Sequence, residues 1–306
     1  MTDILSTVLP VLVTLLLGVI CRKRSALSRE GVNALKNVAV NIALPAVLLN
    51  AFATTRYTWA DLVIPLIMFA VCVIAWLTGR VLGRAFRMKS RFVPFLTTGF
   101  EAGMLGYALF NMLYGAERTA EFARVDLGQV LFVFTAYKVL LGMDGQQKPT
   151  CKQLFRDMAS SPIILAILSG VLIGATGLYE ALVPSGVSAV FDACVGFIAA
   201  PTAVLILLAV GYDLDLSFIP WRDTLKAAAL RLAVMLALGL ALVPLANRFL
   251  PELRLNDALI VMLILPPPFV LPVFADDPEQ RTYVSSVLTV STLAAVVGFA
   301  VLAAIK

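Results

Sequence analysis

Few residues of this 306-residue chain are placed to do chemistry inside an apolar environment, and the clearest is Glu101. It lies in TTGFEAGMLGYALFNMLYG (Thr97–Gly115), near the centre of an apolar run. A charge at the centre of a bilayer costs roughly 2.5 kcal/mol or more, so such residues face a cavity or a partner. Three roles are open for Glu101. It carries a proton, because desolvation disfavours the charged form, or it binds a coupling cation or a polar substrate group. In the third, it pairs with another helix, for instance through Lys138 or Arg231. We favour a role in transport.

A second motif, LILPPPFVLPVF, places Pro266, Pro267 and Pro268 inside another apolar run. Each proline removes a backbone donor and clashes with the preceding turn. Irregular backbone survives at membrane depth only where protein or a wet cavity surrounds it. The run with Glu101 is weakened in turn by Gly99, Gly103 and Gly106. Paired interruptions indicate a transporter site, although the glycines also fit close helix packing.

Other polar residues of the apolar runs are weaker candidates. Asn41, beside Pro45, either caps freed backbone or touches substrate, and Tyr107 and Asn111 follow Glu101 on the same run. Lys36, Lys138 and Arg231 lie near the ends of their runs, so we expect them to extend toward the interface. The candidate site residues are Glu101, Gly103, Gly106, Tyr107, Asn111, Pro266, Pro267, Pro268, Pro45 and Asn41.

Catalytic and metal-binding motifs do not occur in the sequence. Histidine is absent, the four cysteines show no ligand spacing, and no Walker A, HExxH or nucleophile-elbow motif is found. We therefore expect no enzyme, no metal site and no cofactor, with coupling to protons or sodium left open.

The elements that must position these residues are membrane spans. The chain is 60% hydrophobic and 14% charged, with a mean hydropathy of +0.94, whereas soluble domains are about a quarter charged. A span needs about 20 apolar residues, which predicts an all-α integral membrane protein of about ten transmembrane helices. The expected spans are 4–21, 32–53, 61–83, 92–115, 122–142, 160–178, 185–211, 224–247, 257–275 and 282–305.

The positive charge follows the connections between spans and does not indicate nucleic-acid binding. The odd-numbered connections hold fifteen Lys and Arg residues and the even-numbered ones five. The positive-inside rule then places both termini outside, and we expect a multi-pass plasma-membrane protein of a bacterial inner membrane. The fifteen are Arg22, Lys23, Arg24, Arg29, Arg80, Arg84, Arg87, Lys89, Arg91, Lys148, Lys152, Arg156, Arg222, Lys226 and Arg281; the five are Arg56, Arg118, Arg124, Arg248 and Arg254.

The chain divides into two halves of five spans. The predicted boundaries are 1–145 for the first five-helix repeat, 146–159 for a cytoplasmic connector and 160–306 for the second repeat. An odd number of spans per half makes the repeat inverted. Two weak matches agree: Pro10 and Gly18 correspond to Pro162 and Gly170, and IALPAVLL around Pro45 corresponds to IAAPTAVL later in the chain.

With NIALPAVLL, GFEAGMLGYALFNMLYG and ILPPPFVLPVFADD in this order, the whole chain resembles bacterial members of the auxin efflux carrier family. That family includes the plant PIN carriers and permeases often called malate permeases. The resemblance implies that spans four and nine unwind and cross, at Gly103 to Gly106 and Pro266 to Pro268. It also implies a scaffold of spans one, two, six and seven, a moving bundle of the other six, and a homodimer. Plant relatives have an Asn-Thr pair at the span-four break, where Glu101 and Ala102 stand here.

These features favour a secondary carrier for a small organic anion, working by alternating access. Backbone N–H groups at the starts of the half-helices would hold the carboxylate of the substrate. A sodium-coupled symporter of the bile-acid type and a non-transporting membrane sensor are the alternatives. The expected partners are the anion, the lipid bilayer and a second copy of the chain.

Overall fold

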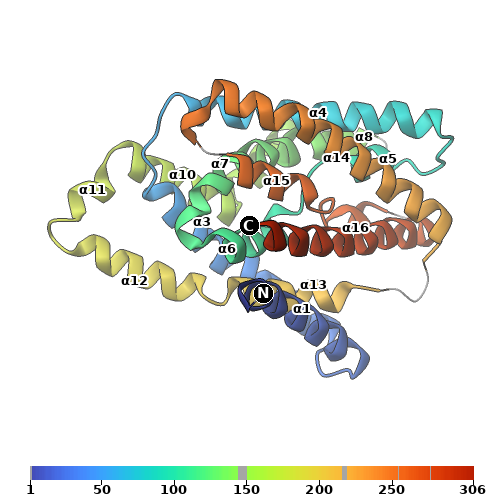
Figure 1. The fold of residues 1–306 in the computed structure, drawn as a ribbon, viewed down its shortest axis with the longest axis horizontal. Helices are drawn as coiled ribbons and strands as arrows, with labels where there is room; N and C mark the ends of the chain where they lie inside the picture. The colour runs from blue at the N-terminus through green and yellow to red at the C-terminus, as the bar shows by residue number, and fades with distance from the viewer. Residues whose placement is uncertain (1, 144–149, 216–218, 254, 276) are drawn as a thin grey trace.

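The computed structural model describes residues 2–143, 150–215, 219–253, 255–275 and 277–306, and within them every regular element is helical (Figure 1). Three are π-helical turns, η1 (Ala39–Ala43), η2 (Ala102–Gly106) and η4 (Val133–Tyr137), and three are 3-10 turns, η3 (Ala116–Arg118), η5 (Pro251–Leu253) and η6 (Leu271–Phe274). The α-helices are α1 (Thr2–Lys23), α2 (Arg29–Val38), α3 (Leu44–Ala53), α4 (Ala60–Ala85), α5 (Val93–Thr97), α6 (Tyr107–Tyr114), α7 (Thr119–Phe132), α8 (Lys138–Met143), α9 (Cys151–Ala159), α10 (Pro162–Ala175), α11 (Leu178–Leu182), α12 (Val187–Ala199), α13 (Thr202–Asp213), α14 (Trp221–Phe249), α15 (Asn256–Ile264) and α16 (Pro278–Ile305).

Among the described residues, seven helical stretches are long and apolar enough to cross a membrane, which makes the chain a multi-pass membrane protein. An eighth counts if α9 and α10, bent by 67°, form one span. These eight correspond to the expected spans except 92–115 and 257–275, which are the two interrupted ones. The seven stretches are Leu5–Lys23, Arg29–Ala53, Asp61–Ala85, Ala116–Gly142, Val187–Asp213, Trp221–Phe249 and Pro278–Ile305.

Pro45 lies inside one of these spans without breaking it. It occupies the first turn of α3, where its missing N–H costs least. The π-helical turn η1 precedes it, and the Leu44 N–H donates to the Ala39 carbonyl across that turn. A π-bulge absorbs the extra residue, so α2, η1 and α3 continue as a single span.

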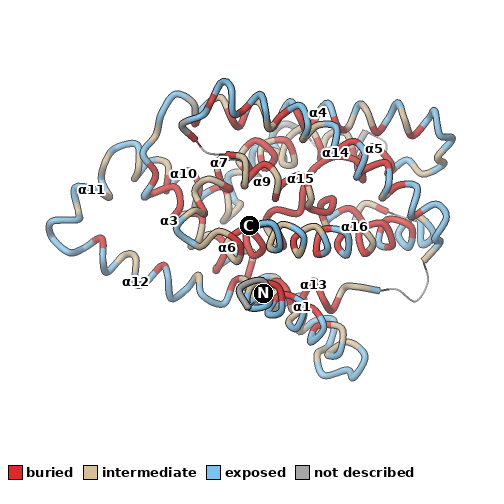
Figure 2. The backbone as a smooth tube through the Cα atoms, viewed as in Figure 1, coloured by how far each residue is buried: buried red, intermediate tan, exposed pale blue. Residues whose placement is uncertain are grey.

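The helices pack in two groups. In one, α1 packs along α13, and α3 packs along α10 and α12; in the other, α4 packs against α5, α7 and α14, and α14 packs against α15 and α16. In Figure 1 the pair α1 and α13 lies below α16, while α4 and α14 run along the opposite edge. Figure 2 shows that burial concentrates around α6, α15 and α16, whereas α11 and α12 are largely exposed.

Two glycines bring the helices of the first group close together. A Cβ on Gly18 of α1 would lie 2.2 Å from the Leu208 carbonyl oxygen of α13. A Cβ on Gly170 of α10 would lie 2.8 Å from the Leu49 carbonyl oxygen of α3. These are the two glycines that match between the halves of the sequence. Gly18 of the first half contacts a helix of the second half, and Gly170 of the second half contacts a helix of the first half.

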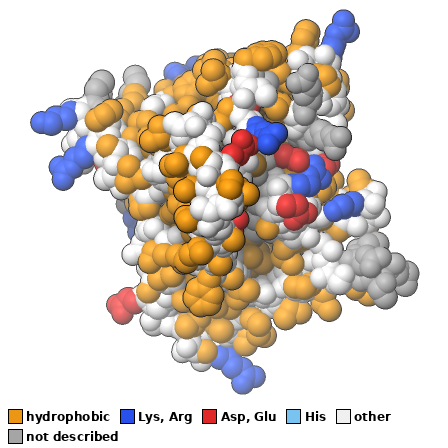
Figure 3. All heavy atoms as spheres, turned by 90° about the vertical axis from the view of Figure 1, so that its left-hand side faces the viewer, with side chains coloured by type: hydrophobic (Ala, Val, Ile, Leu, Met, Phe, Trp, Pro, Cys, Tyr) orange, Lys and Arg blue, Asp and Glu red, His pale blue; other side chains and the backbone are white. Residues whose placement is uncertain are grey.

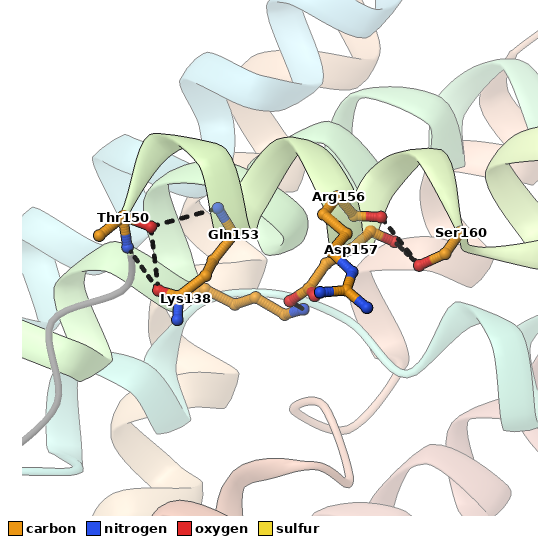
Figure 4. Close-up of polar contacts among 6 residues, drawn as sticks. All are labelled: Lys138, Thr150, Gln153, Arg156, Asp157 and Ser160. Atoms are coloured by element: carbon orange, nitrogen blue, oxygen red, sulfur yellow. Dashed lines mark hydrogen bonds and ion pairs between the residues drawn. The ribbon is translucent and has the colours of Figure 1, made fainter.

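The connector ends in the helix α9, which begins with a capping box between Thr150 and Gln153 (Figure 4). The Thr150 hydroxyl accepts from the Gln153 N–H, and the Gln153 side chain accepts from the Thr150 N–H. Lys138 of α8 points toward Asp157 of α9 and pairs with it at 3.0 Å. Residues 146–149 of the predicted connector lie outside the described residues, so the three boundaries stay predictions.

Candidate substrate site at the crossing of two broken helices

The first broken helix stops at Thr97 and resumes at Ala102 in η2. Thr98 is extended, and Gly99 has a φ of +68°, which a residue without a Cβ adopts at little cost. The break therefore spans Thr98 to Glu101, and the expectation that it lies at Gly103 to Gly106 is wrong.

Gly103 and Gly106 belong to the π-helical turn η2 that follows the break. Gly106 serves packing, because a Cβ there would lie 2.7 Å from both Leu265 and Phe122. The sequence could not distinguish a glycine needed for conformation from one needed for space.

The second broken helix stops at Ile264, the last residue of α15. Leu265 is extended, and Pro266, Pro267 and Pro268 follow without regular structure. The chain then turns through η6, four residues of 3-10 helix, before α16 begins at Pro278. The triple proline thus lies at the interruption, because none of the three supplies the N–H that would continue the helix.

The two interruptions touch each other through their backbones. The Glu101 N–H donates to the Pro266 carbonyl at 2.9 Å. A Cβ on Gly99 would lie 2.9 Å from Cγ of Pro268, so only glycine leaves room for the proline ring.

The carboxylate of Glu101 links the start of the resumed first helix to the turn that follows the triple proline. Its Oε1 accepts from the Met104 N–H at 3.1 Å, and its Oε2 accepts from the Phe269 N–H at 2.5 Å. Glu101 is 9% exposed, and within the described residues it forms an ion pair with neither Lys138 nor Arg231. The N–H groups expected to hold a substrate carboxylate are thus already bound to a carboxylate of the chain itself.

A cavity of about 830 Å³ leads to this carboxylate. Four of the ten candidate residues line it: Glu101, Gly103, Tyr107 and Pro268. The volume is in the range of ordinary small-molecule sites. The cavity therefore ends where the two broken helices meet.

The other six candidates do not line the cavity, namely Asn41, Pro45, Gly106, Asn111, Pro266 and Pro267. Asn41 is exposed and bonds to Asn37 one turn earlier on the same span. Asn111 accepts from the Thr119 hydroxyl at 2.9 Å.

A second carboxylate, Asp126 of α7, lines the same cavity and was not among the candidates. Its Oδ2 accepts from the Tyr107 hydroxyl at 3.0 Å, and its Oδ1 accepts from Nε2 of Gln129 at 3.1 Å. Asp126 is 3% exposed. Its position inside the expected span 122–142 was the signal that could have found it.

Basic side chains line the mouth of the cavity. Lys36 and Arg29 both pair with Asp213, and Nη1 of Arg29 lies 2.9 Å from Oδ1 of Asp213. Lys138 and Arg281 complete the basic lining. Among the residues that the structure describes, the lining thus contains four basic and three acidic side chains. Two of the acids, Glu101 and Asp126, accept one hydrogen bond on each oxygen at the inner end. An anion entering the mouth meets positive charge first.

An aromatic group packs beyond the inner end of the cavity. The Tyr107 and Phe122 ring centroids lie 4.9 Å apart, and those of Phe110 and Phe122 lie 5.1 Å apart. Farther along, Arg118 pairs with Asp257 at 2.9 Å. Figure 3 shows acidic and basic side chains gathered among hydrophobic ones at one end of the molecule. The rings of Phe110 and Phe122 thus pack next to Tyr107, which lines the cavity, and the pair of Arg118 and Asp257 lines a second cavity.

Arg231 of α14 does not extend to the interface, so the expectation of snorkelling is wrong. It follows Trp221, the first residue of α14, by ten positions, which is roughly 15 Å of helix. Its side chain is buried, and its guanidinium donates to the carbonyl oxygens of Leu96, Gly99 and Leu265 at 3.1, 2.8 and 2.8 Å.

Comparison with known proteins supports transport without identifying a substrate. No protein-family model matches the chain. An uncharacterized transporter of Methanothermobacter thermautotrophicus is 26% identical over 250 residues, which cover 78% of each of the two chains. The chain is thus a multi-pass membrane protein, helical in every regular element of its described part, and similar to a transporter, a similarity that argues against an enzyme.

Proposed function

We propose that the protein is a secondary active carrier for a small organic anion and that it works by alternating access. The observation that carries the proposal is the position of the Glu101 carboxylate, at the inner end of the cavity, where it bridges the N–H groups of Met104 and Phe269. A place built to hold one carboxylate is suited to hold another.

Glu101 and the substrate compete for the same donors in this proposal. When Glu101 takes up a proton, its hold on the Met104 and Phe269 N–H groups weakens, and these donors become free for the carboxylate of the substrate. Proton uptake and anion binding are then coupled, and the two cross the membrane together. Asp126 stays hydrogen-bonded to Tyr107 and Gln129 and shapes the pocket.

The basic lining of the cavity includes Arg29 and Arg281, which the charge pattern assigns to the cytoplasm, so this conformation would face inward. Alternating access would move the group of α4 to α8 with α14 to α16 against the group of α1 to α3 with α10, α12 and α13. The reciprocal contacts of Gly18 and Gly170 support a ten-span inverted repeat. Membership of the auxin efflux carrier family, a plasma-membrane location with outer termini and a homodimer belong to the same proposal.

Uptake into proteoliposomes containing the purified protein tests the proposal. A thermal-shift screen of dicarboxylates, aromatic acids and amino acids, at two pH values, would first select the labelled compound. We expect Glu101→Gln, Glu101→Ala and Pro267→Ala to impair uptake, and Arg222→Ala, which changes an exposed residue of α14, to leave it unchanged. Uptake at the normal rate in all three site variants would overturn the site. Counterflow of labelled substrate would exclude a sensor.

A further inference from the structure

Arg231 is a buried cation that the proposed cycle does not use, and all its donors go to backbone. A guanidinium has five N–H groups. Nη1 donates to the Leu96 and Thr98 carbonyls at 3.1 and 3.5 Å, and Nη2 donates to the Gly99 and Leu265 carbonyls at 2.8 Å each. Nε donates to Leu265 at 3.3 Å. The guanidinium is therefore surrounded by the carbonyl oxygens that the two breaks leave without helical partners.

No carboxylate balances this charge among the described residues, where Arg231 takes part in no ion pair. Its positive charge is met by carbonyl dipoles and by the ring of Phe100, whose centroid lies 5.5 Å from Cζ. Unwound carbonyls and helix C-terminal ends are the groups with which broken-helix carriers coordinate the coupling sodium ion or proton. Arg231 does not line the cavity.

We propose that Arg231 is a tethered cation that occupies the carbonyl cluster of the crossing, in the place where a free monovalent cation would otherwise bind. The charge is permanent, because arginine stays protonated in proteins. The crossing is then held together without a soluble ion, and removal of the side chain creates a site for one. This inference rests on the proposed function only in treating the crossing as the working part of a carrier.

Thermal unfolding of purified Arg231→Ala in detergent tests the proposal without any transport measurement. We expect a clear drop in Tm that millimolar guanidinium chloride partly reverses, at concentrations far below the molar range that unfolds proteins. Choline chloride at equal ionic strength should have no effect, because its trimethylammonium group has no N–H donors. Wild type and Arg222→Ala, which lacks an exposed arginine of the same helix, should gain nothing from guanidinium.

A Tm of Arg231→Ala equal to that of wild type would overturn the proposal, and so would equal responses to guanidinium and choline. If Arg231→Ala does not fold, Arg231→Lys and Arg231→Met carry the test. Lysine keeps a tethered cation, so its Tm should lie well above that of methionine, and equal values for the two would count against the proposal.

Uptake in sodium, potassium and choline media completes the experiment. We expect wild-type uptake to be the same in all three. Sodium-dependent uptake by wild type would remove the inference while leaving the carrier function intact. Absence of uptake in every medium, combined with guanidinium rescue of Arg231→Ala, would remove the proposed function and leave the inference.

Discussion

The two sides of the crossing use opposite charges to solve the same problem. On one side, Arg231 donates to carbonyl oxygens at and just after the points where the two helices stop. On the other, Glu101 accepts from N–H groups that follow the two breaks. Arg231 is sealed away from the cavity, whereas Glu101 lines it. The carbonyl side of the crossing therefore contacts only other parts of the protein, whereas the N–H side faces the cavity and is open to a solute. A pair of broken helices thus has one side suited to stabilising the fold and one side suited to binding and releasing a solute.

The largest effect expected from this difference is on stability. Arg231→Met leaves several buried carbonyls unpaired, at about 1–3 kcal/mol for each one that finds no other donor, so it should lower the free energy of unfolding by several kcal/mol. Glu101→Gln keeps an acceptor oxygen for one of the two N–H groups and should cost about 1 kcal/mol. Denaturation of both variants in the same detergent compares them. Equal losses of unfolding free energy in the two variants would contradict a stabilising role for the carbonyl side alone.

The second effect is on transport, where we expect the Glu101 variant to be impaired more than the Arg231 variant. Glu101→Gln cannot lose or gain a proton, so uptake should fall by about tenfold or more, equivalent to about 1.4 kcal/mol. The remaining uptake should no longer depend on pH. Arg231→Lys keeps its charge and should retain the pH profile of wild type. A pH-dependent Glu101→Gln would assign the proton to another group.

A third effect concerns how closely the two breaks approach. Gly99→Ala places a side chain at a φ of +68° and 2.9 Å from Pro268, which should cost about 1–3 kcal/mol. Gly196→Ala is the matched control, because a Cβ there meets nothing within 4 Å. It lies inside α12 and should stabilise the helix by up to about 1 kcal/mol. Equal Tm values for the two variants would contradict the contact between the breaks.

A smaller effect is expected at the second buried carboxylate. Asp126→Asn retains an oxygen that accepts from the Tyr107 hydroxyl, so stability should fall by about 1 kcal/mol at most. Since Asp126 shapes the pocket without exchanging partners, the pH profile of uptake should keep its form. Loss of pH dependence in Asp126→Asn but not in Glu101→Gln would reverse the roles of the two acids.

The smallest effect is expected at the mouth. Lys36→Gln removes one positive charge that an anion meets, and should raise the half-saturating substrate concentration by about twofold, because partly exposed charges contribute about 0–1 kcal/mol. The difference should shrink as salt screens the charges. Lys89→Gln, outside the cavity and exposed, is the control. An effect of Lys36→Gln that is independent of salt would indicate direct binding.

The sequence was informative where a local rule decides the structure. Three prolines in succession cannot continue a helix in any surroundings, and a carboxylate in an apolar run needs a partner, so the triple proline and Glu101 were both found. The long apolar stretches were found for the same reason, since hydropathy over about 20 residues is a local property. The ten-span count and the inverted repeat remain predictions.

The sequence was uninformative where the partner comes from elsewhere in the chain. Arg231 was assigned to the interface because it lies near one end of its span, but its surroundings are set by carbonyls more than a hundred residues away in sequence, in α5 and the break after it. Gly99, Gly103 and Gly106 were all named as weak points, but the crossover was assigned to Gly103–Gly106, because only the folded structure shows that Gly99 contacts Pro268 and Gly106 contacts Phe122. Asn41 and Pro45 were selected by type, while the turn of their helix decides that they face away from the cavity.

The hydrogen bond from the Glu101 N–H to the Pro266 carbonyl has an evolutionary consequence. Both atoms belong to the main chain, so the donor survives any substitution at position 101 except proline, and the acceptor survives every substitution at position 266. Side chains around the crossing can therefore diversify under selection for new nutrients or waste products while this link of the architecture persists. Descendants of one ancestral carrier could in this way acquire different cargoes without inventing a new fold.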